Sequence, residues 1–390
     1  MPHLVIPDFQ PVPFPAPLWL LKTLLVLGFY LHAIPMNVAW GGALIAGLYL
    51  LFGKGRPENY ATRIGHSLAL GLPFFVSLAI TQGIVPLLFL QLVYGPLYYT
   101  SSILMGTPWI LLLVLLLTGY YGLYLYKLKS KKLGGFGAWL LIGVSLLFAL
   151  IGFLFSNNMT LMLHPETWPA VVSSAGIGRG VGTFLNTADP TLLSRYLHIM
   201  LAAIAVAGLA VGGYGLYWHK RDPVYSSWLI SQGSAWYVVI TLIQVAVGGL
   251  FLMSLPRPVM QQFMGHETWG TLAFMGSMVL SLLSLLTLGM AMKSGKSGPF
   301  KIGMVFALLV IFLMALMRHQ LREYTVGAFF HPELVPIKPQ WDLIGIFGGS
   351  AVGLIVYMSW LLKVVCQGFS GGSIAQPGAS VPTPLQEVQR

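Results

Sequence analysis

Residues 194–222 read SRYLHIMLAAIAVAGLAVGGYGLYWHKRD, and this stretch decides the fold class. Its apolar run is long enough to cross a bilayer, because the hydrocarbon core requires about 20 residues of helix. His198 lies one turn inside the first end, and the basic run from His219 to Arg221 marks the other end. An imidazole in hydrocarbon is costly unless it has a partner. His198 therefore predicts a functional site.

The composition of the whole chain is that of a membrane protein. Of its 390 residues, 56% are hydrophobic and only 8% are charged, and the mean hydropathy is +0.80. Soluble domains carry about 25% charged residues. A formal net charge of +11 would suggest nucleic acid in a soluble protein. Here the basic residues fall mostly in short loops between apolar spans, where they set orientation, so we expect no nucleic-acid partner.

Nine apolar stretches are long enough to span a membrane, so we expect an all-α integral membrane protein with nine transmembrane helices. The expected spans are 19–51, 64–94, 108–126, 138–155, 195–218, 237–253, 269–292, 302–317 and 343–362. The first two exceed the minimum length, and we expect them to tilt, to kink near Pro35 and Pro73, or to extend beyond the membrane. With the N-terminus outside, 14 of the 21 lysines and arginines lie on the inner side. This bias predicts that the C-terminus is inside.

The chain divides into three parts on these grounds. Residues 1–17 form an outer N-terminal arm, residues 18–363 form the nine-helix membrane domain, and residues 364–390 form a flexible cytoplasmic tail rich in Gly, Ser, Pro and Gln. The only cysteine, Cys366, cannot make an internal disulfide. The sequence also has no CxxCH motif, which excludes a covalently attached c-type heme in this chain.

Four candidate metal ligands share one expected depth, and they are His32, His198, Met275 and His319. Each lies 18–20 residues from the inner end of its span. At 1.5 Å per residue that places them about 27–30 Å from the inner face, in a layer near the outer surface. Imidazole and thioether are the usual axial pair of a low-spin electron-transfer heme. The layer therefore predicts two or more non-covalent b-type hemes between the helices.

Three of the four candidates have a specific alternative explanation, and His198 has the weakest one because its helix offers few other polar side chains. Asn37 offers His32 a hydrogen-bond partner, and Met275 is one of 17 methionines that serve packing elsewhere. His319 sits in an ion cluster whose other members are Arg318, Gln320, Arg322 and Glu323. Four arginines near the same layer are expected partners of heme propionates, although phosphate headgroups would explain them equally well. They are Arg195, Arg257, Arg318 and Arg322.

A short motif occurs twice in the outer connections, as LMLHPETW (161–168) and QFMGHETW (262–269). His164 and Glu166 of the first copy correspond to His266 and Glu267 of the second. One interpretation is a pair of similar interfacial caps whose tryptophans lie at headgroup level. The alternative is that one or both histidines face a cofactor edge or an electron partner.

Several segments together resemble subunit I of cytochrome bd quinol oxidase. They are LLSRYLHIMLAAIAVAGLAVGGYGLYW (192–218) with FLNTADP before it, LHAIPMNVAWGGALIAGLYLL (31–51), ITQGIVPLLFLQLVYGPLYY (80–99), HETWGTLAFMGSM (266–278) and RHQLREYTVG (318–327). The resemblance implies nine spans with the N-terminus outside and hemes near the outer face. It also implies a prokaryotic cytoplasmic membrane, a quinone or quinol partner, and at least one further membrane subunit.

The sequence departs from that family at three places. The family's acidic position in its Glu-Phe-Gln-Phe-Gly motif falls near Gln91, and no Asp or Glu occurs between Glu58 and Glu166. The long quinol-binding loop is reduced to residues 254–268, and the acidic heme ligand falls among the non-acidic residues 314–317. His319 is a replacement candidate for that ligand. The loss of protonatable groups argues against oxygen reduction coupled to protons from the inside.

Together these features predict a b-type cytochrome subunit that moves electrons between the quinone pool and a membrane partner or a periplasmic cytochrome. His198 and Met275 are expected to hold one low-spin heme, and His32 and His319 to ligate others. Arg195, Arg318 and Arg322 are the expected cofactor-binding cations. The redox chemistry belongs to the heme, which makes the chain the heme-bearing part of a quinol-linked oxidoreductase. The alternatives are a terminal quinol oxidase of the cytochrome bd type, and a heme-free transporter or structural subunit.

Overall fold

The computed structural model describes residues 12–53, 59–175 and 182–371. Over these ranges the backbone is helical apart from short connections, in agreement with the expected all-α class. Eight helices are long and apolar enough to cross a membrane: α1 (Leu18–Phe52), α2 (Tyr60–Leu104), α3 (Gly106–Leu133), α4 (Phe136–Leu163), α6 (Leu192–Trp218), α7 (Pro223–Ser254), α9 (Thr268–Ser294) and α10 (Ser297–Val326). The protein is thus a multi-pass membrane protein.

Shorter elements lie between these helices. They are η1 (Pro165–Thr167), α5 (Trp168–Ala175), α8 (Arg257–Gln261), η2 (Gln262–His266) and η3 (Pro332–Leu334). The ninth expected span falls in α11 (Trp341–Gly371), and its crossing of the membrane stays a prediction, as does the orientation of the termini. Residues 1–11 of the expected arm and 372–390 of the expected tail lie outside the described residues.

Most helices are longer than their expected spans. The span expected at residues 237–253 belongs to α7, which already begins at Pro223, where the side chain of Asp222 accepts a hydrogen bond from the backbone N–H of Tyr225. Proline is favourable in the first turn because it has no N–H to leave unpaired. Hydropathy marks only the lipid-embedded part of a helix, so it does not detect turns that continue into the interfacial region.

The kink in the long second helix lies at Tyr94, not near Pro73 as one expectation had it. Within α1 and α2, the one residue with non-helical dihedral angles is Tyr94 (φ −121°, ψ 30°). Pro96 follows two residues later, and a proline inside a helix removes a hydrogen bond and clashes with the preceding turn. The kink turns the C-terminal part of α2, and Tyr94 lies in the core.

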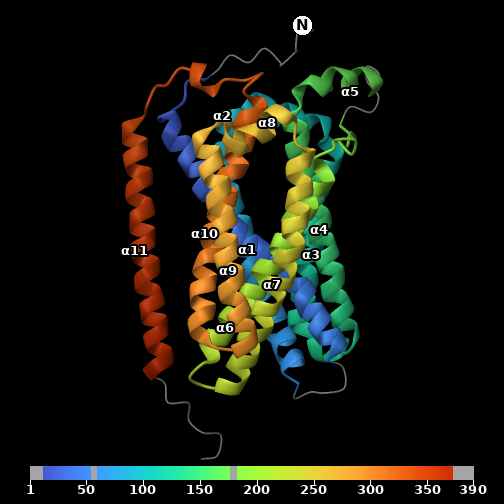
Figure 1. The fold of residues 1–390 in the computed structure, drawn as a ribbon, viewed down its shortest axis with the longest axis vertical. Helices are drawn as coiled ribbons and strands as arrows, with labels where there is room; N and C mark the ends of the chain where they lie inside the picture. The colour runs from blue at the N-terminus through green and yellow to red at the C-terminus, as the bar shows by residue number, and fades with distance from the viewer. Residues whose placement is uncertain (1–11, 54–58, 176–181, 372–390) are drawn as a thin grey trace, which may run out of the picture.

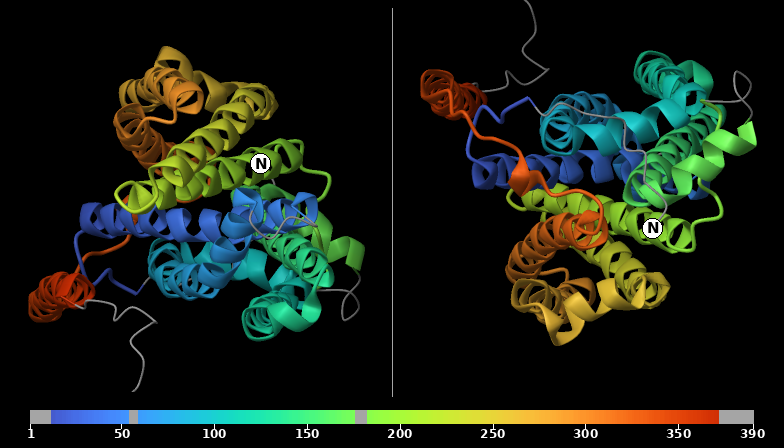
Figure 2. Two further views of the ribbon diagram at one scale, coloured as in Figure 1. Left: turned by 90° about the horizontal axis from the view of Figure 1, so that it is seen from below. Right: turned by 90° about the horizontal axis from the view of Figure 1, so that it is seen from above.

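Two groups of helices pack side by side (Figures 1 and 2). Helices α1 to α4 form one group, and α6, α7, α9 and α10 form the other, with α1 packed against α6 between them. A Cβ on Gly41 of α1 would lie 2.3 Å from the carbonyl oxygen of Ala203 on α6. Lipid tails are as apolar as the helix side chains, so the hydrophobic effect does not drive helices together inside a membrane. Close packing of backbones at small residues, as here, stabilises their association instead. α11 stands apart from both groups, with mostly exposed side chains among those described.

Candidate functional site

The four expected ligands lie at similar distances along their helices. They are 19–22 residues from one end of α1, α6, α9 and α10, and those ends lie together at one end of the bundle (Figure 1). At 1.5 Å per residue the distances are about 28–33 Å, a spread of one helical turn. The helix arrangement is therefore consistent with a shared layer.

Three arginines come together in this layer, of which Arg322 is buried and Arg195 and Arg318 are half-buried. Arg195 of α6 and Arg318 and Arg322 of α10 lie close enough for their charges to interact with one another. Only 4% of Arg322 is exposed. His319 lies beside the same group, since the charges of Arg318 and Arg322 act on its ring. The fourth expected arginine, Arg257, is exposed on α8 and is not part of this arginine cluster.

The arginines of the cluster make no close ion pair among the described residues, although the charge of Asp189 acts on Arg195. Among the described residues, no carboxylate lies within 4.0 Å of the guanidinium nitrogens of Arg195, Arg318 or Arg322. Arg195 Nε and Arg322 Nη1 are buried and find no hydrogen-bond partner in the described protein. Unpaired charges and donors of this kind are costly in an apolar interior. A group with two carboxylates, such as a heme with its propionates, fits this donor set.

The two other histidines, His198 and His32, each lie near an aromatic ring that also contacts an arginine. The ring of Phe251 lies 5.2 Å from the Arg195 guanidinium, and its centroid is 6.4 Å from that of His198. In the same way, Phe29 lies 4.1 Å from the Arg318 guanidinium, and its centroid is 6.3 Å from that of His32. The structure thus connects three expected histidines and three expected arginines into one region.

The hydrogen bonds of His32 suit a metal ligand. Its Nδ1 lies 2.8 Å from the backbone carbonyl oxygen of Ala79 on α2. A carbonyl oxygen can only accept, so Nδ1 carries the hydrogen and the lone pair is on Nε2. Metal-ligating histidines are usually oriented by such a bond from the other ring nitrogen. The sequence alternative, a bond between His32 and Asn37, does not occur among the described contacts.

His198 and His319 retain unpaired ring nitrogens. His198 Nδ1 and His319 Nδ1 are buried without a hydrogen-bond partner in the described protein. The amide of Gln244 on α7 is 3.5 Å from His198 Nε2, at the limit of a hydrogen bond. A buried imidazole with one unsatisfied nitrogen is available to a ligand.

No described contact joins Met275 to the other candidate ligands. Its side chain on α9 is 56% exposed, and Met278 one turn later is 47% exposed. The structure shows neither a pair of Met275 with His198 nor a packing role for it in the core clusters. Its assignment as a heme ligand stays a prediction.

An ion cluster that the sequence did not predict borders the site. Lys22 Nζ on α1 lies 2.7 Å from Glu323 Oε2 and 2.8 Å from Glu333 Oε1, and the Tyr94 hydroxyl also donates to Glu323. Partial burial acts to raise the pKa of Glu333, but the hydrogen bonds from Lys22 and the backbone, together with the charges of Lys22 and His331, lower the net pKa. Tyr94 also stacks on Arg322, with 5.1 Å from its ring to the guanidinium. A lysine near the start of α1 was the available signal, since Glu323 lies in the last turn of α10, which ends at Val326.

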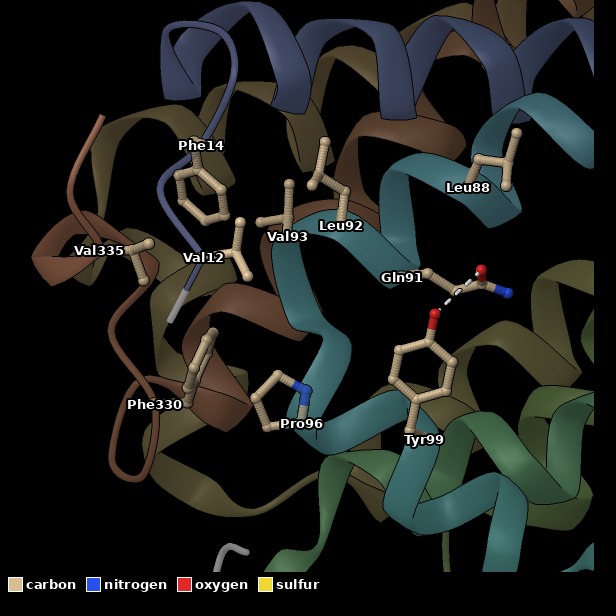
Figure 3. Close-up of a pocket in the computed structure, with 10 residues that line it drawn as sticks. All are labelled: Val12, Phe14, Leu88, Gln91, Leu92, Val93, Pro96, Tyr99, Phe330 and Val335. Carbon is tan, nitrogen blue, oxygen red and sulfur yellow. Dashed lines mark hydrogen bonds between the residues drawn. The ribbon is translucent and has the colours of Figure 1, made fainter. Parts of the chain in front are cut away.

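Gln91 lines a pocket of about 290 Å³ (Figure 3). The pocket lies at the kink of α2 and is otherwise apolar, with Phe14 and Val335 on one side and Tyr99 on the other. The Tyr99 hydroxyl donates to Gln91 Oε1 over 3.4 Å. An amide does not titrate, so Gln91 brings no carboxyl group to this pocket.

Comparisons with known proteins support the fold. Neither a family model nor a curated protein matches the sequence. The fold is similar to a chain in the structure of bd oxidase from Geobacillus thermodenitrificans, with a TM-score of 0.70 and 10% sequence identity. The match covers 91% of this chain and 99% of that chain. At this identity the similarity shows the fold alone, and at that level it confirms the expected resemblance to cytochrome bd oxidase.

Proposed function

We propose that this protein is a b-type cytochrome subunit of a respiratory membrane complex, which carries electrons between the quinone pool and a membrane or periplasmic partner. The observation that carries the proposal is the cluster of Arg195, Arg318 and Arg322, three buried or half-buried cations with no carboxylate within 4.0 Å among the described residues. It lies beside the histidines expected to bind iron.

Two kinds of side chain would hold the cofactor. The arginines neutralise the propionates, since guanidinium binds carboxylate through two parallel hydrogen bonds. His32, His198 and His319 would supply imidazole nitrogens to iron, and Met275 would supply a thioether to the heme that His198 holds. Bound heme supplies one-electron redox chemistry. The rigid helices fix the positions of the ligands and keep water away from them.

Electron transfer is favoured over oxygen reduction because carboxylates are missing from the first four helices. Gln91 replaces an acid, and among the described residues between Asn59 and Pro165 there is no carboxylate. Proton delivery across hydrocarbon needs a chain of titratable side chains.

A second candidate is a terminal quinol oxidase of the cytochrome bd type. The observation in its favour is Glu323, a half-buried carboxylate bonded to Lys22 and Tyr94 next to Arg322. It provides a protonatable group from the outer side, where the resemblance places the hemes.

Optical spectroscopy of the purified chain tests the proposal. A dithionite-reduced minus oxidised spectrum is expected to show b-type bands, and the pyridine hemochromogen is expected to give two or more hemes per chain. No heme in a folded preparation would refute the proposal and favour a transporter or structural subunit. Carbon monoxide then separates the two cytochromes, because an oxidase needs an open iron that binds it, whereas the electron-transfer protein is expected to show no shift.

A further inference from the structure

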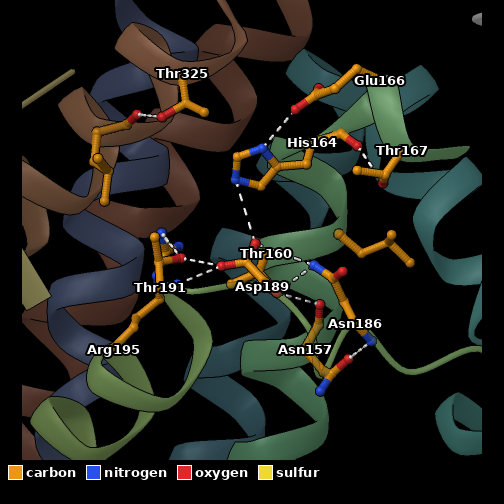
Figure 4. A network of polar contacts seen from close by, with 12 residues as sticks. Asn157, Thr160, His164, Glu166, Thr167, Asn186, Asp189, Thr191, Arg195 and Thr325 are labelled. Carbon is orange, nitrogen blue, oxygen red and sulfur yellow. Dashed lines mark hydrogen bonds and ion pairs between the residues drawn. The ribbon is translucent and has the colours of Figure 1, made fainter. Parts of the chain in front are cut away.

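One outer network is not used by the proposed heme site. It is centred on His164, the residue after α4, which lies between two carboxylates (Figure 4). His164 Nδ1 is 2.9 Å from Glu166 Oε1, and His164 Nε2 is 3.4 Å from Asp189 Oδ2. A carboxylate can only accept hydrogen bonds, so the ring satisfies both partners only when both nitrogens carry hydrogen.

One end of the network is exposed to solvent and the other end is buried. The side chain of Glu166 is 44% exposed and that of His164 is 21% exposed, whereas that of Asp189 is 4% exposed. Asp189 Oδ1 accepts from the backbone N–H and the hydroxyl of Thr191, at 2.7 and 2.6 Å. A buried carboxylate is stable only when it is bonded in this way. The three side chains therefore form a path from solvent into the protein.

The buried end of the path reaches the arginine cluster. Arg195 Nη2 donates to the Thr191 hydroxyl over 3.4 Å, and the charge of Asp189 acts on Arg195. Beyond Arg195 lies Arg322 of α10. The charged and titratable groups that the described residues place around His164 are thus Glu166, Asp189, Arg195 and, one step farther, Arg322. A proton gained at His164 changes the charge next to the arginines that are expected to hold the cofactor.

We infer that Glu166, His164 and Asp189 form a redox-linked proton-exchange site on the outer side of the protein. When the cofactor at the arginine cluster gains one electron, His164 takes up one proton from outer water and becomes doubly protonated. When the electron leaves, His164 returns the proton by the same path past Glu166. The inference rests on the proposed cytochrome function and adds a proton to its electron transfer.

The second copy of the motif supplies the comparison. His266 is exposed, and Glu267 bonds to the N-terminus of α9 and to the Tyr324 hydroxyl. The tryptophans differ too, because Trp168 is 3% exposed and Trp269 is 72% exposed. The interpretation of two similar interfacial caps is therefore wrong, because Trp168 of the first copy is buried and Glu166 contacts His164. His266 is the natural control for His164.

The decisive test measures the midpoint potential of each heme against pH by spectroelectrochemistry. A proton taken up on reduction stabilises the reduced state, so one potential is expected to fall as pH rises. In His164→Asn the potential is expected to stay near the high-pH value at all pH. At low pH the equilibrium constant for reduction is then several-fold smaller than in the unchanged protein. His266→Asn is expected to keep the original profile.

A second measurement needs no variant. Diethyl pyrocarbonate modifies only an unprotonated imidazole nitrogen, so reduction of the protein is expected to slow the modification of His164 and not of His266, as read by peptide mass spectrometry. Equal rates in the oxidised and reduced protein, or a pH profile that His164→Asn leaves unchanged, would overturn the inference while the heme bands still support the proposed function. A protein without heme would instead refute the proposed function itself.

Discussion

Arginines without a close ion pair among the described residues are the main residue-scale feature of this protein. Arg195 and Arg322 each have a buried nitrogen without a partner, and His198 and His319 do too. Most buried polar groups in proteins are paired, so unpaired ones call for an explanation. Four of the seven expected site residues have a buried nitrogen without a partner in the described protein, which favours a polar group bound between the helices. Membrane phosphate would instead reach exposed arginines such as Arg257.

The arginine cluster makes a first prediction. Arg322→Gln removes one charge near the expected propionates and is expected to lower heme retention during purification, with a loss of at least tenfold in heme affinity, since a buried charge pair contributes about 1.5–3 kcal/mol. Arg257→Gln, an exposed arginine, is the matched control and is expected to retain its heme. Heme per chain from the pyridine hemochromogen gives the result, and equal retention in both variants would contradict it.

Replacing the histidine of α6 makes a second prediction. His198→Ala is expected to remove the spectrum of one heme and to keep the fold, because no strong hydrogen bond depends on its ring. Met275→Leu is expected to alter the same low-spin bands. His66→Ala, whose ring bonds to the Tyr126 hydroxyl, is expected to leave them unchanged. Full heme content in His198→Ala would refute the ligand, and a loss seen only in Met278→Leu would move the second ligand by one turn.

At the scale of elements, the contact of α1 with α6 joins the two helix groups. Their small residues allow the backbones to approach closely, which a larger side chain would prevent. This contact also sets how far His32 on α1 lies from Arg195 on α6, so the geometry of the site depends on it.

A glycine at this contact makes a third prediction. Gly41→Ala adds a Cβ 2.3 Å from the Ala203 carbonyl oxygen and is expected to destabilise the protein by about 1–3 kcal/mol. Gly213→Ala on α6 has no atom within 4 Å of the new Cβ and is expected to stabilise by about 0.5–1 kcal/mol. Thermal unfolding in detergent measures both. Equal melting temperatures would mean that the helices can move apart at no cost.

The N-terminus of α9 makes a fourth prediction, on pH. The hydrogen bond from Tyr324, and those from the backbone N–H groups of Gly270 and Trp269, lower the pKa of Glu267. A lowered pKa gives stability that is present above the unfolded value of about 4.5 and is lost as pH falls through the folded value. Glu267→Gln is therefore expected to cost about 0.5 kcal/mol at pH 7 and little at pH 3. Melting temperatures of both proteins at the two pH values test it, and a pH-independent difference would contradict it.

At the scale of the whole molecule, charge is distributed unequally between the two ends of the bundle. The basic residues that follow α3, such as Lys131 and Lys132, lie at the end opposite the candidate site. Lysines and arginines near helix ends favour the cytoplasmic side. This asymmetry predicts that the site faces outward.

The single cysteine makes a fifth prediction, on topology. In intact cells Cys366 is expected to resist a membrane-impermeant maleimide and to react after the membrane is opened. Ser173→Cys in a Cys366→Ser background places the thiol on exposed α5 and is expected to react in intact cells. The opposite pattern would reverse the orientation and put the arginine cluster on the inner side.

The sequence alone determined the fold class, the membrane setting and the level of the candidate ligands, because hydropathy and helical rise depend on local residues only. It also indicated His32, His198, His319 and the three arginines, since polar side chains are rare in apolar spans. Tertiary structure decided which of them meet. The rings of Phe29 and Phe251, the ion pairs of Lys22, and the bracketing of His164 by Asp189 join residues far apart in the chain. Their contacts depend on how helices turn and cross, which no local pattern encodes.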